Sequence, residues 1–290
     1  MSSFFNYHMH TRFSDGKGEP ADWVSTALEL GFFSIGFSEH SPLPFDNTFA
    51  LKKENFAEYI RTINELKKEY ADKIAVYCGL EMDFIPGISE NFAEVKEKNS
   101  LDYIIGSVHL ISNEEKDALW FIDGPTADIY ESGLKYIFGN DIRKAVSAYF
   151  RQLNQMISTE SFEIIGHFDK IKMHNRNRYF REDESWYRDL IMETLVLIAE
   201  RGLIIEANTR GIYKKRSHSL FPGIEVLEAA REMNIPVTIS SDAHLPGEMA
   251  ALFPETLDQL QEVGFKELHY LSESGWSAIS IERLINSGSL

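Results

Sequence analysis

Cysteine is almost absent from this 290-residue chain, and so is any excess of positive charge. Cys78 is the only cysteine, which excludes an intramolecular disulfide bond and a zinc site built on several thiolates. The 29 lysine and arginine residues stand against 45 aspartate and glutamate residues, giving a formal net charge of −16. Because proteins bind nucleic acids through an excess of positive charge, this balance argues against a nucleic-acid partner.

Long hydrophobic runs are missing as well, since no segment approaches the roughly 18 apolar residues of a membrane-spanning helix. The first residues, from Met1 to Asn6, contain neither the basic stretch nor the apolar core of a secretory signal. Together with the single cysteine, this predicts a cytoplasmic chain that is neither exported nor inserted in a membrane. The sequence also lacks repeats, low-complexity tracts and Pro/Ser-rich linkers, so we expect one domain over residues 1–290.

Short apolar runs rich in β-branched residues alternate with longer segments of helical period. This alternation is typical of strand–helix units repeated around a parallel sheet, and it predicts an α/β barrel. The predicted strands are Tyr7–His10, Ser34–Ser38, Ile74–Met82, Tyr103–Val108, Ile164–Phe168, Leu203–Ala207, Pro236–Ser240 and Leu268–Leu271. The predicted helices are Pro20–Leu30, Asn55–Tyr70, Asn91–Lys98, Ile142–Met156, Trp186–Glu200, Ile224–Met233 and Pro254–Val263.

The stretch from about residue 111 to residue 140 interrupts this alternation, because it separates a predicted strand from the following helix. We interpret it as a long loop insertion, since connections of this length are usually functional loops or lids. The alternative is a surface insertion that packs its own small aromatic cluster. The aromatic residues available for such a cluster are Trp120, Phe121, Tyr130, Tyr136 and Phe138.

Side chains that bind metal ions gather at the carboxyl ends of the predicted strands. His8 and His10 share one face of a strand, about 6.6 Å apart, and could hold one ion together. Asp242 and His244 repeat this spacing after a later strand. The remaining candidates, which bring the set to nine side chains from six strands, are Asp15, His40, Glu81, His109 and His167. Because the carboxyl ends of barrel strands converge on one face, we expect a metal site there.

The segments that hold these side chains occur in order along almost the whole chain. They read HMHTRFSDG at 8–16, FSEHS at 37–41, GLEMD at 79–83, GSVH at 106–109, GHFD at 166–169 and SDAH at 241–244. This set resembles the PHP (polymerase and histidinol phosphatase) family, and most closely its histidinol-phosphate phosphatase branch. The resemblance implies a distorted, TIM-like (β/α)7 barrel with the metal site at the C-terminal ends of the strands. It places the eighth predicted strand, Leu268–Leu271, outside the barrel.

The resemblance also implies a trinuclear centre of divalent metal ions. Three sets of side chains, two of which share Glu81, would hold the ions: His8, His10, Glu81 and Asp242 the first, Glu81, His109 and His167 the second, and Asp15, His40 and His244 the third. Glu81 would bridge two ions, since an anionic ligand reduces the repulsion between neighbouring dications. Nitrogen and oxygen ligands without thiolate suit zinc, iron or manganese and do not choose among them.

Such a centre suits hydrolysis of a phosphate ester, because clustered dications lower the pKa of bound water to about 7 and stabilise the attacking and leaving oxygens. We predict that the nucleophile is a metal-bridging hydroxide held by Glu81, Asp242 and His244. The phosphate needs cationic partners, and among the basic residues beyond the strand ends we favour three, each of which could instead be a solvated surface charge. These residues are Arg210, Arg216 and Lys172.

We therefore expect a phosphatase that hydrolyses L-histidinol phosphate to L-histidinol and phosphate in histidine biosynthesis. A chain of charge −16 repels polynucleotides, whereas an acidic rim accepts the amine and imidazole of this small substrate. Glu39 could meet such a cationic group or support a metal ligand. One alternative is another small phosphomonoester, such as a nucleotide or sugar phosphate. The other is a non-catalytic metal-binding barrel, against which the nine filled ligand positions argue.

Overall fold

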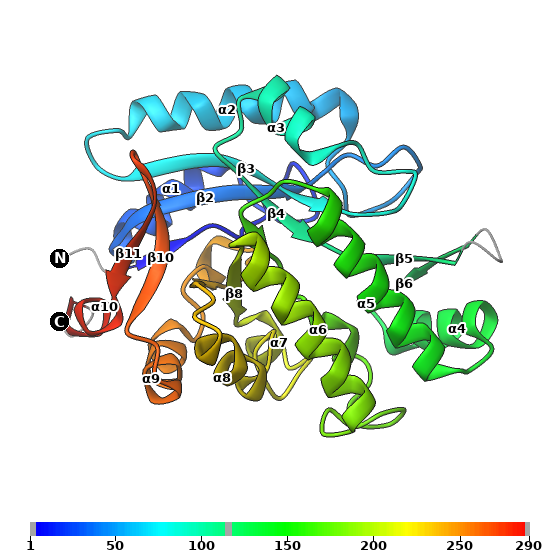
Figure 1. Ribbon diagram of the computed structural model, residues 1–290. Coiled ribbons are helices and arrows are strands. Elements are labelled where there is room, and N and C mark those ends of the chain that lie inside the picture. Colours follow the sequence, from blue (N-terminus) through cyan, green and yellow to red (C-terminus); the bar gives the residue numbers. More distant parts are fainter. Residues whose placement is uncertain (1–3, 114–117, 288–290) are drawn as a thin grey trace.

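The computed structural model describes residues 4–113 and 118–287 (Figure 1). Seven parallel strands form one sheet in the order β1-β2-β3-β4-β7-β8-β9. Their bounds are β1 (Phe4–Asn6), β2 (Phe32–His40), β3 (Ala75–Asp83), β4 (Tyr103–Ser107), β7 (Ile164–Ile165), β8 (Ile204–Asn208) and β9 (Val237–Ser240). Just beyond β1 and β9, His10 N donates to Ala243 O at 2.9 Å, and Met9 and Ala243 form a parallel bridge. The sheet is therefore a distorted, nearly closed (β/α)7 barrel, as predicted.

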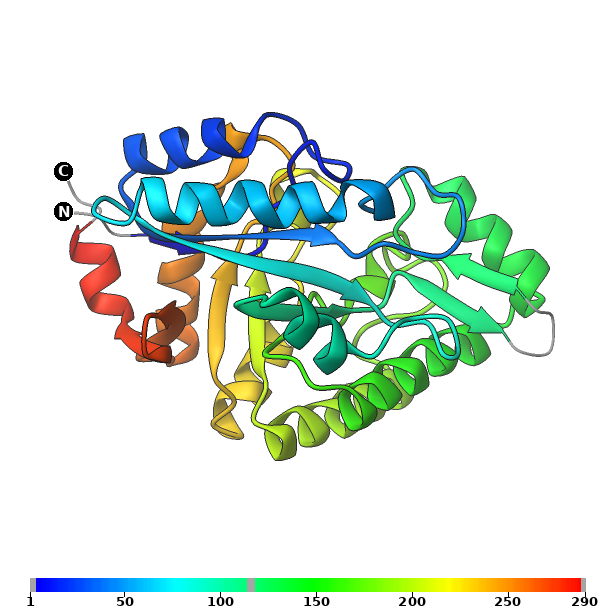
Figure 2. The ribbon, with the colours of Figure 1, turned by 90° about the horizontal axis from the view of Figure 1, so that it is seen from above.

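Helices cover the outside of the sheet (Figures 1 and 2). The longer ones are α1 (Pro20–Glu29), α2 (Phe56–Glu69), α3 (Phe92–Asn99), α5 (Ile142–Thr159), α6 (Ser185–Arg201), α8 (Ile224–Glu232) and α9 (Phe253–Val263). Short turns are η1 (Lys53–Asn55), η2 (Lys170–Lys172), α7 (Arg210–Tyr213) and η3 (Pro246–Glu248). Local sequence fixes several ends: Asp141 caps α5 by accepting from Lys144 N, and α6 stops at Gly202, whose φ of 65° is left-handed. Among the described residues, none of the helices has both the length and the apolar character needed to cross a bilayer.

One strand lies entirely before its predicted position and another is shorter than predicted, because side chains take the backbone N–H groups that a longer ladder would use. The β1 ladder ends at Asn6, whose Oδ1 accepts from His8 N at 3.0 Å. The β7 ladder ends at Ile165, and His167 N donates to Glu206 Oε1 at 2.6 Å. The histidines predicted to lie in these strands therefore lie just beyond them.

The eighth predicted strand lies outside the barrel, as the resemblance implied. β10 (Glu267–Ser272) pairs with β11 (Gly275–Ser280) in an antiparallel hairpin that leads into α10 (Ile281–Ser287). From this hairpin, the Trp276 ring contacts the rings of Tyr7 and Tyr103, with centroids 5.5 and 6.4 Å apart. Tyr103 fills the barrel interior because two neighbouring strands carry glycine. A Cβ at Gly36 or Gly79 would lie 2.5 Å from the Tyr103 side chain.

The insertion is structured, which corrects the prediction of a long loop. β5 (Leu110–Asn113) and β6 (Ala118–Phe121) form a hairpin, and α4 (Ala127–Phe138) follows it; residues 114–117 lie outside the described part. The reason is an aromatic cluster in which Trp120 Nε1 donates to Tyr130 O at 3.0 Å and the Trp120 ring lies 5.3 Å from that of Phe138. One contiguous hydrophobic core includes buried residues from Phe5 to Leu284. The single-domain interpretation stays a prediction.

Candidate metal centre

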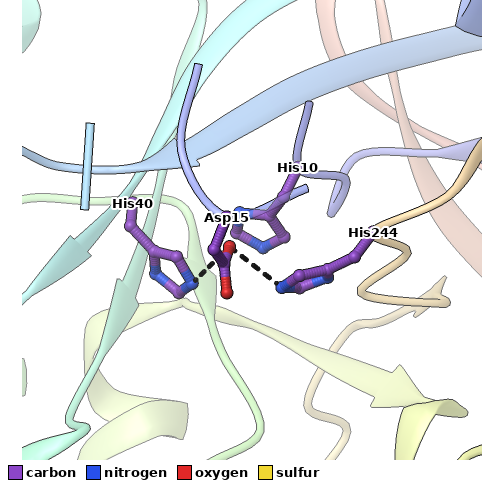
Figure 3. Close-up of side chains that lie close together, drawn as sticks. All are labelled: His10, Asp15, His40 and His244. Carbon is purple, nitrogen blue, oxygen red and sulfur yellow. Dashed lines mark ion pairs between the residues drawn. The ribbon is translucent and has the colours of Figure 1, made fainter. Parts of the chain in front are cut away.

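All nine side chains predicted to bind metal lie together at or just beyond the carboxyl ends of the strands. They form overlapping groups in which one nitrogen or oxygen atom from each residue lies within 4.8 Å of the others. The groups are His10–Asp15–His40–His244 (Figure 3), His8–His10–Asp242, His8–Glu81–His167 and His40–Glu81–His109. We call these nine residues the ligand cluster. The structure brings together what the strand ends predicted, while the assignment of individual ions stays a prediction.

Glu81, at the end of β3, directs its two carboxylate oxygens to different imidazoles. Oε1 lies 2.9 Å from His167 Nε2 and 3.4 Å from His109 Nε2. Oε2 lies 3.2 Å from His8 Nε2 and 3.0 Å from His40 Nδ1. Burial opposes ionisation of this carboxyl, but the surrounding imidazoles outweigh burial and hold its pKa well below the usual range. A charged carboxylate between two sets of imidazoles fits a bridge between two cations.

Asp15 joins the cluster from the loop that follows β1. Its Oδ1 lies 3.1 Å from His244 Nε2 and 3.7 Å from His40 Nε2 (Figure 3). The loop is held by the buried Glu39, which accepts from Thr11 N at 2.9 Å, from Thr11 Oγ1 at 2.6 Å and from the hydroxyl of Ser14. Both oxygens of Glu39 are used in this way. Glu39 therefore supports the loop that carries a predicted ligand.

The donor set of the cluster fits divalent metal ions. Several buried atoms have no hydrogen-bond partner among the described residues, although such atoms are almost always paired in proteins. They include His8 Nε2, both ring nitrogens of His10, His109 and His167, His40 Nδ1 and Glu81 Oε2. Burial lowers the pKa of His10, His167 and His244, which favours the neutral imidazole that binds metals. Unpaired imidazole nitrogens beside carboxylates are a typical site for zinc, iron or manganese.

Glu206 belongs to this site and was missed by the sequence analysis. Its Oε2 lies 2.8 Å from His8 Nδ1, and its Oε1 accepts from His167 N, so one carboxylate orients two predicted ligands from different strands. Ser240 Oγ also donates to it, at 2.5 Å. The available signal was a charged residue inside the apolar strand Ile204–Asn208, where it is fully buried. Asp83 was quoted in a motif without a role, and its Oδ1 accepts from His109 N at 2.8 Å.

A pocket of about 250 Å³ opens onto the ligand cluster. Its lining includes Asp15, His40, His109, Asp242 and His244 from the cluster, together with Asp123. Three cations also line it: Lys170, Arg210 and Arg216. The Arg210 guanidinium reaches the cluster directly, with Nε 3.9 Å from Asp242 Oδ1. Arg210 and Arg216 thus lie in the pocket beside the cluster, and their contact with phosphate stays a prediction.

Lys172, the third predicted phosphate contact, is not among the residues that line the pocket. Its Nζ lies 2.6 Å from Asp169 Oδ2 and 3.1 Å from Glu182 Oε2. Lys170 lines the pocket instead, with Nζ 2.9 Å from Asp123 Oδ2. Both lysines lie in the 3₁₀ turn η2, where residues two apart point in different directions because each turn has three residues.

Comparisons with known proteins place this geometry in a family. Residues 6–210 match the family model described as PHP domain. A curated protein of Deinococcus radiodurans, named "Probable histidinol-phosphatase", is 28% identical over 269 residues, or 91% of this chain and 95% of that protein.

Two solved structures share the fold. A crystal structure from Listeria monocytogenes has a TM-score of 0.76 at 21% identity and covers 87% of this chain and 99% of that one. The histidinol phosphate phosphatase of Lactococcus lactis, complexed with zinc, L-histidinol and phosphate, has a TM-score of 0.66 at 21% identity and covers 95% and 99%. Because the family model matches well over half of its residues, the chain belongs to the PHP domain family.

Proposed function

We propose that this chain hydrolyses L-histidinol phosphate to L-histidinol and inorganic phosphate with the help of divalent metal ions. The observation that carries the proposal is a small pocket in which five residues of the ligand cluster meet three cations. Two relatives support the same reaction here. The Deinococcus radiodurans protein is named a histidinol-phosphatase, and the Lactococcus lactis structure holds zinc, L-histidinol and phosphate together.

The ligand cluster would hold three ions, with Glu81 as the bridge. His8, His10, Glu81 and Asp242 would bind the first ion, Glu81, His109 and His167 the second, and Asp15, His40 and His244 the third. When bound, such ions supply Lewis acidity, which lowers the pKa of water and neutralises charge on the phosphoryl oxygens. Asp242 Oδ1 lies 3.6 Å from His244 Nδ1, and with Glu81 these two residues would hold the attacking oxygen. Zinc in the Lactococcus lactis structure favours zinc over iron or manganese.

Lys170, Arg210 and Arg216 would bind the phosphate oxygens that face away from the cluster. Burial works against a charged Lys170, but Asp123 and Asp242 beside it raise the pKa of its ammonium above the usual value. The lysine therefore keeps its charge in the pocket. Arg210 is largely buried, and its planar guanidinium suits bidentate contact with phosphate.

Size and charge favour a small substrate with a cationic tail. A pocket of about 250 Å³ is smaller than most sites for drug-sized ligands, and Asp15 and Asp123 add negative charge to its lining. The net charge of −16 opposes a polynucleotide. We also propose a cytoplasmic location, in keeping with the single cysteine, Cys78.

The direct test combines elemental analysis of the purified protein with kinetics on a panel of phosphomonoesters. We expect about three transition-metal ions per chain, and a kcat/KM for histidinol phosphate at least about 100-fold above that for p-nitrophenyl phosphate. A preference for a nucleotide or sugar phosphate would move the substrate assignment and leave the metal centre in place. A metal content near zero after reconstitution, with the fold intact, would refute the metal centre.

A further inference from the structure

Two phenylalanine rings stack at the wall of the pocket. The ring centroids of Phe49 and Phe121 are 5.3 Å apart, and the planes differ by 28°. Both residues line the pocket, and neither is buried, so part of each ring faces solvent. Aromatic rings of this size normally lie in the core. A stacked pair left open beside a reaction site offers a flat apolar surface to a ligand.

Both rings are fixed next to residues of the ligand cluster. The Phe49 ring contacts the His40 ring edge-on with centroids 5.4 Å apart, and Leu51 N donates to His40 O at 3.0 Å. Phe121 ends β6, and the next residue continues this anchoring, because Ile122 N donates to His109 O at 3.1 Å. The distance between the rings and the cluster is therefore set by backbone hydrogen bonds at two strand ends.

The aromatic pair and the cations come from different parts of the barrel. Phe49 follows β2, and Phe121 lies in the hairpin that follows β4, whereas Lys170 follows β7 and both Arg210 and Arg216 follow β8. In the sheet order β1-β2-β3-β4-β7-β8-β9, the strands that precede the two rings come before those that precede the cations, and the two groups meet where β4 pairs with β7. The pocket thus has a cationic part, suited to phosphate, and an aromatic part, suited to whatever group the phosphate carries.

We infer that Phe49 and Phe121 form a platform that binds the planar ring of the substrate's leaving group and so sets substrate specificity. The inference rests on the proposed function in naming that ring as the imidazole of histidinol. Aromatic faces attract flat rings, and they attract a cationic ring more strongly. Because Phe121 belongs to the structured insertion, this role also gives the insertion a function: it completes the binding site beside His109.

The test compares substrates with and without a ring, in the wild type and in the double variant Phe49→Leu/Phe121→Leu. Leucine keeps the wall apolar but removes the flat face. We expect kcat/KM for histidinol phosphate and for p-nitrophenyl phosphate to fall about tenfold, mainly through KM, whereas phosphoethanolamine, which has an amine and no ring, changes less than about twofold. Metal content should stay unchanged. Phe33→Leu, a partly exposed phenylalanine outside the pocket lining, is the matched control.

Calorimetry provides a readout that does not depend on turnover. The wild type should bind L-histidinol about tenfold more tightly than L-alaninol, which lacks the ring, and the double variant should bind the two alike. Equal losses for substrates with and without a ring, or no loss for either, would refute the platform. Histidinol phosphate could prove a poor substrate while the double variant still loses the wild type's preference for p-nitrophenyl phosphate over phosphoethanolamine. In that case the platform stands and the proposed substrate is wrong.

Discussion

Buried polar side chains fill two neighbouring regions of the barrel, and the two regions differ in whether individual polar atoms lack a hydrogen bond. In the first region, which we call the tyrosine cluster (Tyr7, Tyr59 and Tyr103), each hydroxyl has a partner. The Tyr103 hydroxyl donates to Tyr7 O at 2.6 Å, the Tyr59 hydroxyl donates to Gly79 O at 2.7 Å, and the Tyr7 hydroxyl accepts from Leu271 N at 2.9 Å. In the ligand cluster, several imidazole nitrogens and one carboxylate oxygen have no hydrogen-bond partner within residues 4–113 and 118–287.

This difference indicates that the tyrosine cluster stabilises the fold, whereas the ligand cluster lowers the stability of the metal-free protein and serves function. A buried polar group without a partner costs about 1 to 3 kcal/mol, so a collection of such groups persists only where something else compensates. Cations bound by the ligand cluster would do so. Removing a hydroxyl from the tyrosine cluster should therefore reduce stability and spare activity. Removing a ligand should reduce activity and leave the stability of the metal-free protein largely unchanged.

The largest effect on activity is expected from Glu81→Gln, which keeps the shape of the proposed bridging side chain and removes its charge. Loss of residues that only orient metal ligands typically costs 10- to 100-fold, so loss of the bridge itself should lower kcat more than about 100-fold. Metal content should fall as well, as measured by elemental analysis after dialysis. Glu90→Gln, on an exposed residue, is the control and should change neither quantity. Near-normal rate and metal content in Glu81→Gln would show that Glu81 is not the bridge.

Glu206→Gln should have the next largest effect, because Glu206 orients His8 and His167 without belonging to the predicted ligands. We expect metal affinity to fall about 10- to 100-fold, with little change in KM at saturating metal. Glu163→Gln is a matched control, since that carboxylate binds Lys96 and Ile104 N away from the cluster. Competition with a chelator measures the affinity. An equal loss in both variants would point to general destabilisation.

Lowering the pH should weaken metal binding, because protons and metal ions compete for the same imidazoles. Burial lowers the pKa of His8, His40 and His109, but nearby carboxylates outweigh burial and raise it above the usual value. These rings therefore hold protons in the metal-free protein until the pH rises through their raised pKa values. Below these pKa values, each proton that a metal ion must displace lowers the apparent metal affinity about tenfold for every unit by which the pH falls. Zinc titrations between about pH 6 and pH 8 check this, and an affinity independent of pH would contradict it.

The ligand cluster could be predicted from the sequence because the prediction requires only that the ligands lie near the carboxyl ends of parallel strands. It does not require the exact residue at which each strand ends. The carboxyl ends of parallel strands converge whether β7 ends at Ile165 or three residues later. The bounds themselves could not be predicted, since Asn6 and Glu206 take backbone N–H groups through contacts that appear only in the folded chain. Glu206 shows a usable signal that was overlooked: a charged residue in the middle of an apolar strand.

Directions of side chains beyond the strand ends were harder to predict. Lys170 and Lys172 are the same residue type and both follow His167 within five residues, and only the 3₁₀ turn directs one to the pocket and the other to Asp169. In the insertion, likewise, the sequence identified the aromatic residues but did not predict which of them pack together. That pairing depends on Trp120 packing against Tyr130 in a helix 10 residues further on.

The smallest expected effect on activity, and the sharpest test of the contrast, comes from Tyr103→Phe in the tyrosine cluster. The substitution leaves the fully buried Tyr7 carbonyl without its 2.6 Å donor, so the free energy of unfolding should fall by about 1 to 3 kcal/mol. The Phe37 carbonyl keeps the Tyr59 hydroxyl as a donor, which limits the loss. Metal content and kcat/KM should stay within about twofold, because Tyr103 belongs neither to the pocket lining nor to the ligand cluster. Denaturant unfolding of the metal-free protein measures the stability, with Tyr179→Phe, on a partly exposed ring, as the control. If Tyr103→Phe instead lowered metal content and left stability unchanged, the two clusters would not divide stability and function in this way.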